Sequence, residues 1–345
     1  EITRQLTEEQ FNLLDFLSGM RRAGISGCAG SGKTLLAVEK ARRLANQGYE
    51  VLLTCFNRNL ADWLKERLRD TPGVTVSTFS KLCEDFAQRA NLLPPPERRQ
   101  GADYFDRLLP EALLDATATL PDRFDAILVD EGQDFDASWW VALEALLRDA
   151  DDGILYVFFD ESQALYSRMK QVSELPVGGS LFPLTRNCRN TQEIHKVVAQ
   201  HYHGARQIAC QGAPGRVVEF LTMDEGKNAA ARALRQILHR LIHDEHVPAS
   251  DIVVLSPVRA QSHWSEGQRI GNYALTWGLY PSAPNAITCA TIYAFKGLER
   301  PVVIVTELEE SYAEIGDELR YVAFSRATNH LIVLARSVDT PVGAP

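Results

Sequence analysis

Eight residues in the first tenth of the chain have the types and the spacing of a phosphate-binding loop. Residues 27–34 read Gly-Cys-Ala-Gly-Ser-Gly-Lys-Thr and match G-x-x-x-x-G-K-[ST], a loop whose backbone N–H groups surround nucleotide phosphates. Glycine lets the backbone turn and approach a phosphate without a Cβ clash. Lys33 is expected to reach the β- and γ-phosphates, and Thr34 to offer its hydroxyl to Mg²⁺. The expected phosphate-loop contacts are Gly27, Ala29, Gly30, Ser31, Gly32, Lys33 and Thr34.

Acidic residues follow two apolar runs further along the chain. Residues 126–129 are Ala-Ile-Leu-Val and lead into Asp130 and Glu131, and residues 154–159 are Ile-Leu-Tyr-Val-Phe-Phe and lead into Asp160. Directly after a buried strand, Asp130 can hold Mg²⁺, usually through water, and Glu131 can accept a proton from an attacking water. Two adjacent carboxylates are also common as solvated bystanders at strand ends. Their position about 100 residues after a phosphate loop favours the catalytic interpretation.

Strand candidates alternate with helical stretches along the whole chain. This alternation predicts an α/β fold with mostly parallel sheets covered by helices on both faces. Ligands on such sheets bind at the carboxyl ends of the strands, where the phosphate loop and the acids are expected to meet. A break with proline and two glycines at 173–179 predicts a first domain over 1–173 and a second over 174–345, the second without a phosphate loop.

Composition excludes some classes of protein. The net charge of −9 gives no global attraction to nucleic acid, although a local basic cleft can still act within a Debye length. The six cysteines are scattered without a disulfide or metal spacing, which indicates a reducing compartment. No run of 18 apolar residues is present, so no contact with a membrane is expected, and the cytoplasm is the expected location.

Ordered segments of the chain resemble the motifs of UvrD/Rep/PcrA-type superfamily 1 helicases. The string Asp130-Glu131-x-Gln133-Asp134 is similar to motif II of that family. The other segments follow in the family's order: 6–10 (the Q motif), 54–57 (Ia), 76–79 (Ib), 159–166 (III), 184–190 (IV), 290–299 (V) and 321–327 (VI). The resemblance implies two RecA-like P-loop NTPase lobes, ATP and Mg²⁺ as cofactors, and an ATP-dependent translocase or helicase of superfamily 1A.

The resemblance also assigns roles at the nucleotide. It implies that Arg189 and Arg326 of the second lobe neutralise charge on the γ-phosphate, for which the planar guanidinium is suited. It implies that Gln163 senses the γ-phosphate and that Gln10 reads adenine. In motif V, Gly297 is expected at the nucleotide and Glu299 at the ribose hydroxyls.

For nucleic acid, the expected partner is single-stranded DNA or a duplex with a single-stranded tail. Phe56 and Tyr166 are candidates for stacking on bases, because every base offers a π-face. The alternative for Phe56 is a core aromatic residue at a strand end. Polar contacts to the nucleic-acid backbone are expected from segments Ia, Ib and V and from the helix that follows Ia, namely from Asn57, Arg58, Lys65, Thr78 and Thr291.

The chain also departs from the family. Cys188 stands where motif IV usually has a tyrosine that stacks on adenine, and residues 84–123 leave room for only a reduced insertion of two short helices. These departures and the missing initiator methionine suggest a compact motor module of a longer protein, with a nuclease-related domain as the candidate attachment. The alternative function is a regulatory ATP switch that binds a protein partner and does not unwind DNA. A small-molecule kinase explains neither the second half nor residues 321–327.

Overall fold

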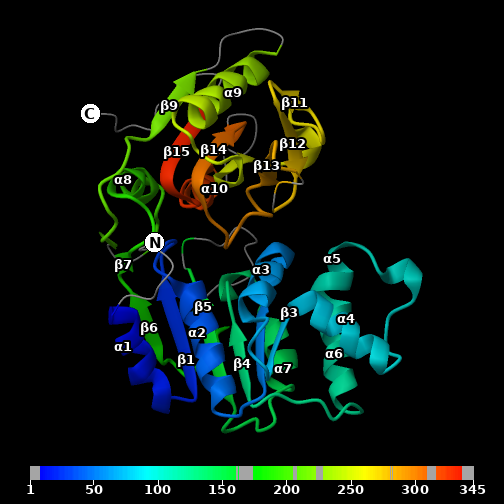
Figure 1. The fold of residues 1–345 in the computed structure, drawn as a ribbon. Helices are drawn as coiled ribbons and strands as arrows, with labels where there is room; N and C mark the ends of the chain where they lie inside the picture. Colours follow the sequence, from blue (N-terminus) through cyan, green and yellow to red (C-terminus); the bar gives the residue numbers. More distant parts are fainter. Residues whose placement is uncertain are drawn as a thin grey trace. The chain divides into compact units, whose positions relative to one another are not determined.

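The structure is a computed structural model that describes residues 8–160, 162, 174–204, 208–222, 228–279, 281, 283–308 and 316–335. The chain divides into two compact units, Glu1–Arg186 and Asn187–Pro345, each with its own sheet (Figure 1). The division falls later than the predicted boundary after residue 173, because β6 (Leu181–Leu184) pairs with β1 (Arg22–Gly27) of the first sheet. The last strand of the first unit therefore follows the Pro- and Gly-containing break rather than preceding it.

The first unit contains a six-stranded, entirely parallel sheet in the order β3-β2-β4-β5-β1-β6. The two central strands β4 and β5 are buried along their whole length, as continuous apolar runs in a doubly covered parallel sheet should be. Figure 1 shows α2 packed across one face of this sheet. The remaining strands are β2 (Val51–Cys55), β3 (Val74–Thr78), β4 (Ala126–Val129) and β5 (Ile154–Phe159). The helices are α1 (Glu8–Phe16), α2 (Lys33–Asn46), α3 (Arg58–Leu68), α4 (Phe79–Arg89), α5 (Gly101–Asp103), α6 (Leu109–Thr117) and α7 (Ala137–Glu144).

Because all strands run the same way, their carboxyl ends share one edge of the sheet. The phosphate loop leaves β1 at this edge, Asp130 follows β4 and Asp160 follows β5. Asn57 and Thr78 begin α3 and α4 there, and their side-chain oxygens accept hydrogen bonds from the first-turn N–H groups of those helices. The prediction that the loop and the acids meet at one edge agrees with this topology.

The segment 84–123 extends the first unit beside β3. Its helices α5 and α6 follow α4 in the chain after a connecting segment, and α6 packs against both α4 and α7 (Figure 1). The Trp139 indole N–H on α7 donates to the Asp106 carbonyl at 3.0 Å, and the Trp139 ring stacks on Phe79. The insertion therefore shares the hydrophobic core of the first unit.

The second unit contains a seven-stranded sheet in the order β11-β12-β13-β10-β14-β15-β9. All of its neighbouring pairs are parallel except β11 with β12, so the prediction of an α/β fold with mostly parallel sheets is confirmed. The strands are β9 (Glu219–Thr222), β10 (Ile252–Ser256), β11 (Arg269–Ile270), β12 (Tyr273–Trp277), β13 (Ala286–Thr291), β14 (Arg300–Thr306) and β15 (Ala327–Ala335). The helices are α8 (Gln192–Gln200), α9 (Ala229–His239) and α10 (Gly316–Phe324), and β7 (Arg186–Asn187) pairs with β8 (Ala209–Cys210).

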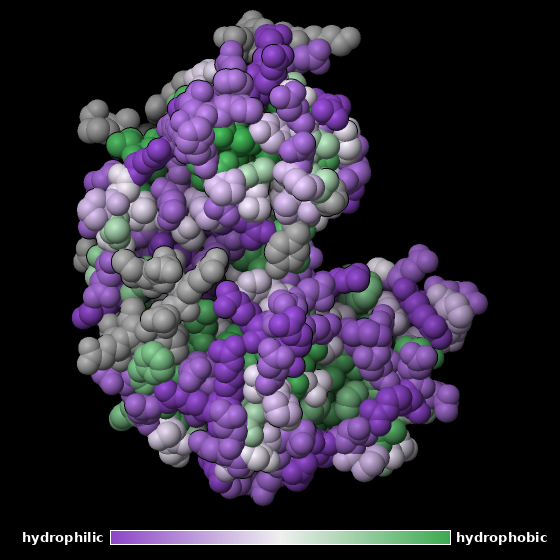
Figure 2. Space-filling model, in the orientation of Figure 1, coloured by the Kyte–Doolittle hydropathy of each residue, from purple (hydrophilic) through white to green (hydrophobic). Residues whose placement is uncertain are grey.

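The face shown in Figure 2 is mostly hydrophilic over both units, and its apolar residues form small separate patches. The large apolar side chains with the highest exposure lie on different elements: Val217 precedes β9, Phe16 ends α1 and Val141 lies on α7. Within the described ranges, no helix combines the length and the apolar character that crossing a membrane requires.

A buried histidine fixes β15, the strand that begins directly after Arg326. His330 Nε2 lies 2.8 Å from Glu219 Oε1 on β9, and the same carboxylate accepts two hydrogen bonds from Arg240 at 2.8 and 2.9 Å. Burial lowers the pKa of His330, although the carboxylates of Glu219 and Glu245 oppose this shift and Arg216 adds to it. The folded protein therefore favours the neutral imidazole.

This shift predicts a pH-dependent contribution of His330 to stability. Below about pH 6.5 the unfolded chain binds a proton that the folded chain resists, so the free energy of unfolding falls as the pH drops. His330→Gln keeps a hydrogen-bonding side chain that does not titrate. The melting temperature of the variant minus that of the wild type should therefore increase when the pH is lowered from about 7.5 to about 5.5. Thermal unfolding followed by circular dichroism measures both melting temperatures. An unchanged difference at the two pH values would contradict the assignment.

Candidate nucleotide site and arginine cluster

The phosphate loop has the backbone that its sequence predicts. It leaves β1 at Gly27 and enters α2 at Lys33, and both Gly30 (φ 80°) and Gly32 (φ 88°) adopt left-handed backbone. A Cβ on Gly27 would lie 2.5 Å from Ser31 Oγ, and one on Gly32 would lie 2.3 Å from Gln10 Nε2. Ala29 and Ser31 are buried within the loop. The left-handed backbone at 32 thus favours glycine, and a Cβ there would also displace the Gln10 amide from the loop.

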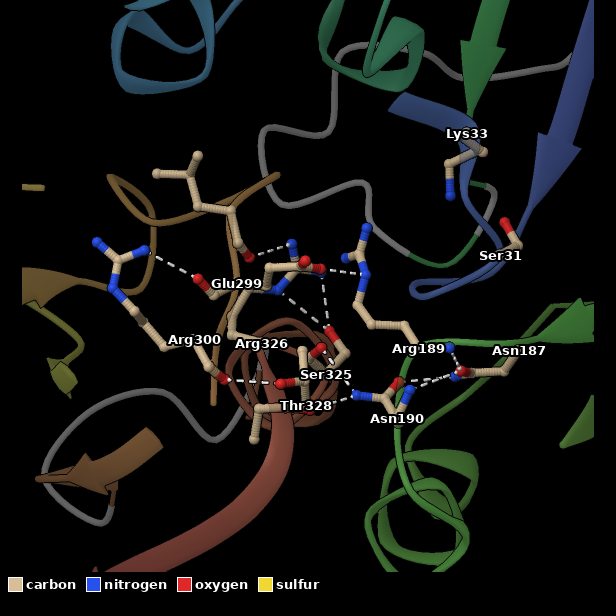
Figure 3. A network of polar contacts seen from close by, with 12 residues as sticks. Ser31, Lys33, Asn187, Arg189, Asn190, Glu299, Arg300, Ser325, Arg326 and Thr328 are labelled. Atoms are coloured by element: carbon tan, nitrogen blue, oxygen red, sulfur yellow. Dashed lines mark hydrogen bonds and ion pairs between the residues drawn. The ribbon is translucent and has the colours of Figure 1, made fainter. Parts of the chain in front are cut away.

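Lys33 lies with its charge inside the loop. Its ammonium donates to the carbonyls of Gly27 at 2.7 Å and Cys28 at 2.9 Å, and it lies 3.6 Å from Asp160 Oδ2. The side chain is only 6% exposed, so these oxygens replace most of its hydration. Figure 3 shows Lys33 and Ser31 on this loop. The ammonium is therefore a buried positive charge at the position where a phosphate would bind.

Gln10 of α1 contacts the loop directly. Its Nε2 donates to the Ser31 carbonyl at 2.7 Å, and the residue is buried. The side chain therefore holds the loop from outside, in addition to any contact with adenine, which stays a prediction.

Asp130 and Thr34 form the candidate metal position. Asp130 is fully buried, and its carboxylate accepts a hydrogen bond from the Glu131 N–H at 3.1 Å. Burial, and then the charge of Glu131, raise the pKa of Asp130 to about 7, against the lowering effects of the Thr34 hydroxyl and the Lys33 ammonium. Asp130 Oδ2 is buried with no hydrogen-bond partner among the residues that the structure describes. A carboxylate oxygen of this kind next to a hydroxyl fits Mg²⁺, which prefers hard oxygen ligands.

Glu131 is held in a strained backbone conformation. Its φ of 57° is left-handed, which is uncommon for a residue other than glycine and is typical of functional positions. The Gln133 side-chain amide donates to Glu131 Oε2, and its own Oε1 accepts the Asp160 N–H at 3.0 Å. Gln133 therefore ties the Glu131 carboxylate to the end of β5. The sequence places Gln133 in motif II but does not reveal this bridge, because the partner lies on another strand.

In the second unit, the predicted arginines lie close to the amino ends of β14 and β15. The Arg326 side chain is buried and donates to the Val322 carbonyl at 2.9 Å, to Ser325 Oγ at 2.8 and 3.2 Å and to the Leu298 carbonyl at 3.4 Å (Figure 3). Arg189 forms an ion pair with Glu299. Gly297 has φ 81° in the turn that precedes β14. The structure thus brings together Arg189, Glu299 and Arg326, which are separated by up to 137 residues in the sequence.

Several of the candidate nucleic-acid residues have partners within the fold. Phe56 packs against the core of the first unit and stacks with Trp139 at 6.1 Å between ring centroids, which favours the core alternative. Arg58 is exposed at the start of α3, and Lys65 pairs with Asp62. Thr291 ends β13 and accepts the Ala294 N–H at 3.0 Å. Tyr166 lies outside the described residues, as does Gln163, the predicted γ-phosphate sensor. Binding of nucleic acid by any of the candidate nucleic-acid residues stays a prediction.

Comparisons with known proteins found a family model and solved structures that are similar to this chain. A family described as an AAA domain matches residues 17–168, which include the phosphate loop, Asp130 and Glu131. No curated protein matches the chain.

Among solved structures, an arterivirus nonstructural protein 10 (helicase) is 13% identical with a TM-score of 0.47, and the match covers 92% of this chain and 60% of that one. The PRRSV helicase is 13% identical with a TM-score of 0.47 over 95% of this chain and 55% of that one. The arterivirus protein in a complex with DNA is 12% identical, with a TM-score of 0.45 over 92% and 62% of the two chains. The chain thus spans less than two thirds of the length of these structures.

The loop geometry predicts the effect of adding a single methyl group. Gly32→Ala should weaken the binding of a fluorescent ATP analogue by roughly tenfold or more, because the new Cβ meets Gln10 and strains the left-handed backbone. Equilibrium fluorescence titration measures this loss.

The chain offers a matched control for this substitution. Gly48 also has φ 88°, and a Cβ there would meet nothing within 4 Å, so Gly48→Ala carries the same backbone strain away from the loop. Equal losses of affinity in the two variants would contradict a specific role for Gly32.

Proposed function

We propose that the chain is an ATP-dependent translocase or helicase of superfamily 1A that acts on single-stranded DNA. The observation that carries this proposal is the buried Lys33 ammonium on a phosphate loop, facing Asp160 at the edge where Asp130 and Glu131 follow the neighbouring strand. This arrangement supplies a phosphate cradle, a metal position and a candidate base together, as phosphoryl transfer to water requires. The resemblance to the UvrD/Rep/PcrA-type motifs selects a nucleic-acid motor among the ATPases that share these parts.

The proposed chemistry assigns a role to each part of the site. Lys33 exchanges its carbonyl partners for phosphate oxygens, and Glu131, oriented by Gln133, positions and deprotonates the attacking water. Thr34 and Asp130 would hold Mg²⁺, which offsets charge on the phosphates when bound. Arg189 and Arg326 place positive charge beside the γ-phosphoryl oxygens during transfer and stabilise the negative charge on them. Gln163 would report the state of the γ-phosphate, while Gln10, Gly297 and Glu299 would contact the nucleoside.

A second candidate is a regulatory ATP switch that binds nucleotide and a protein partner without unwinding DNA. It is favoured by the engagement of Phe56 with Trp139 and of the Asn57 and Thr78 oxygens with helix N–H groups, since each of these side chains is already used within the fold. In this case the chain would serve a larger protein, with a nuclease as the candidate attached domain.

Two substitutions test the ATPase assignment. Lys33→Ala and Glu131→Gln should each lower kcat for ATP hydrolysis by roughly 10²–10⁴-fold, because one removes the buried positive charge and the other removes the base. Phosphate release measured with a coupled assay gives kcat. Lys81→Ala, which removes an exposed lysine paired with Asp85, is the control and should retain wild-type turnover. Full activity of either site variant would overturn the assignment.

Nucleic acid should stimulate the same activity. We expect single-stranded DNA to raise the rate of ATP hydrolysis, with a half-saturating concentration that rises with salt because phosphate contacts release counterions. Titration of an oligonucleotide at two salt concentrations measures both effects. The absence of stimulation by any DNA or RNA would favour the regulatory switch. Strand-displacement and triplex-displacement assays then separate unwinding from translocation.

A further inference from the structure

A fully buried asparagine connects the two segments that carry the arginines. Asn190 Nδ2 donates to the carbonyl of Ser325 at 3.1 Å and to the carbonyl of Ala327 at 2.6 Å (Figure 3). These two carbonyls flank Arg326 in the sequence. The two hydrogens of the Asn190 amide therefore bind the backbone on both sides of Arg326.

A second buried asparagine fixes the other arginine. Asn187 Nδ2 donates to Asn190 Oδ1 at 2.7 Å, and Asn187 Oδ1 accepts the N–H groups of Arg189 at 3.1 Å and Asn190 at 3.0 Å. The turn that carries Arg189 is thus closed on Asn187, and Asn190 links this turn to the segment of Arg326. One chain of hydrogen bonds joins the backbone at both arginines.

The environment of Asn190 also restricts its backbone. A Cβ on Gly212 would lie 1.8 Å from the Asn190 carbonyl oxygen, and the Gln211 N–H donates to the Asn187 carbonyl at 2.8 Å. The neighbouring strand segment therefore holds residues 187–190 from the other side. With both sides fixed, the Asn190 amide has little freedom to find other partners.

The chemistry at this position is specific to an amide. The two carbonyls require a group with two donor hydrogens, and Asn187 requires an acceptor on the same side chain. Aspartate would place an oxygen against two carbonyl oxygens, and serine has one hydrogen to donate and a shorter reach. Neither side chain can reproduce the three contacts of Asn190.

We propose that Asn190 is a positioning residue that fixes Arg189 and Arg326 relative to one another, so that the two guanidinium groups act as one unit. This inference rests on the proposed function, in which both arginines neutralise the γ-phosphoryl group. Positioning matters because a misplacement of about 1 Å can cost roughly 10²-fold in rate. Asn190 acts through the arginines and does not contact the nucleotide in this scheme.

The test is a double-mutant cycle on ATP hydrolysis by the full chain. Asn190→Asp should lower kcat by about 10- to 100-fold and leave the KM for ATP within about threefold of the wild type, because it disturbs charge placement in the transition state. Arg326→Lys keeps the charge but loses the planar fork. In that background, Asn190→Asp should lower kcat by no more than about threefold, because the arginine through which Asn190 acts is already impaired.

A structural role would behave differently. A loss of kcat by the same factor in both backgrounds, or an increase in KM alone, would overturn the inference. Thr306→Val is the matched control: it removes the acceptor of the Trp264 indole N–H and the donor to the Leu255 carbonyl, at the end of β14 remote from Arg300. This variant should be destabilised in thermal unfolding yet retain kcat.

Two further results separate the possible failures. If Asn190→Asp does not fold, Asn190→Ser is measured in the same cycle, and it should show the same loss of kcat and the same dependence on Arg326. A wild-type protein that does not hydrolyse ATP refutes the proposed function and this inference together. A wild-type protein that hydrolyses ATP while both Asn190 variants keep its kcat refutes the inference alone.

Discussion

The structure of the phosphate loop in the first unit depends on how the buried positive charge of Lys33 is compensated. Transferring an ammonium from water into a protein interior is costly unless oxygen atoms replace its hydration. Lys33 meets this constraint with the carbonyls of Gly27 and Cys28 and with Asp160. The loop therefore directs these two carbonyls toward its own centre, and its backbone is left-handed at Gly30 and Gly32. Phosphate oxygens can take over the same compensation, so the loop is stable in a form that is ready to exchange partners.

The neighbouring carboxylates impose the opposite constraint. Asp130 and Glu131 are both buried next to each other, and the mutual repulsion of their charges adds to the effect of burial in raising the pKa of Asp130. Gln133 offsets part of this cost by donating to Glu131. A bound divalent cation would offset the rest. The two constraints are complementary, because a metal-bound triphosphate brings an anion to Lys33 and a cation to Asp130.

The sequence predicts the parts of the site that depend on local residues. The phosphate loop and the acids after β4 and β5 are short strings, and their meeting at one sheet edge follows from parallel strands. The chain division could not be predicted from the break at 173–179, because β6 joins the first sheet through tertiary pairing with β1. The contacts of Gln10 with the loop and of Gln133 with Asp160 also join segments that are distant in the sequence. The residues predicted for the site in the second unit do not follow the rule that places ligands at carboxyl ends, because Arg326 directly precedes β15 and Glu299 directly precedes β14.

Polar contacts orient the positive side chains of both units. In the first unit, the Lys33 ammonium faces the Asp160 carboxylate. In the second unit, the Arg326 guanidinium donates to the Val322 carbonyl and to the Ser325 hydroxyl, which fix its orientation. Arg189 is instead paired with Glu299, the residue proposed to contact ribose. If a nucleotide uses both residues, ribose hydroxyls replace Arg189 at Glu299 and phosphate oxygens replace Glu299 at Arg189. The hydrogen bonds of the Asn187 and Asn190 side chains are independent of that exchange, since they involve neither the Arg189 guanidinium nor the Glu299 carboxylate. The arginine can therefore change partners while its backbone position stays fixed.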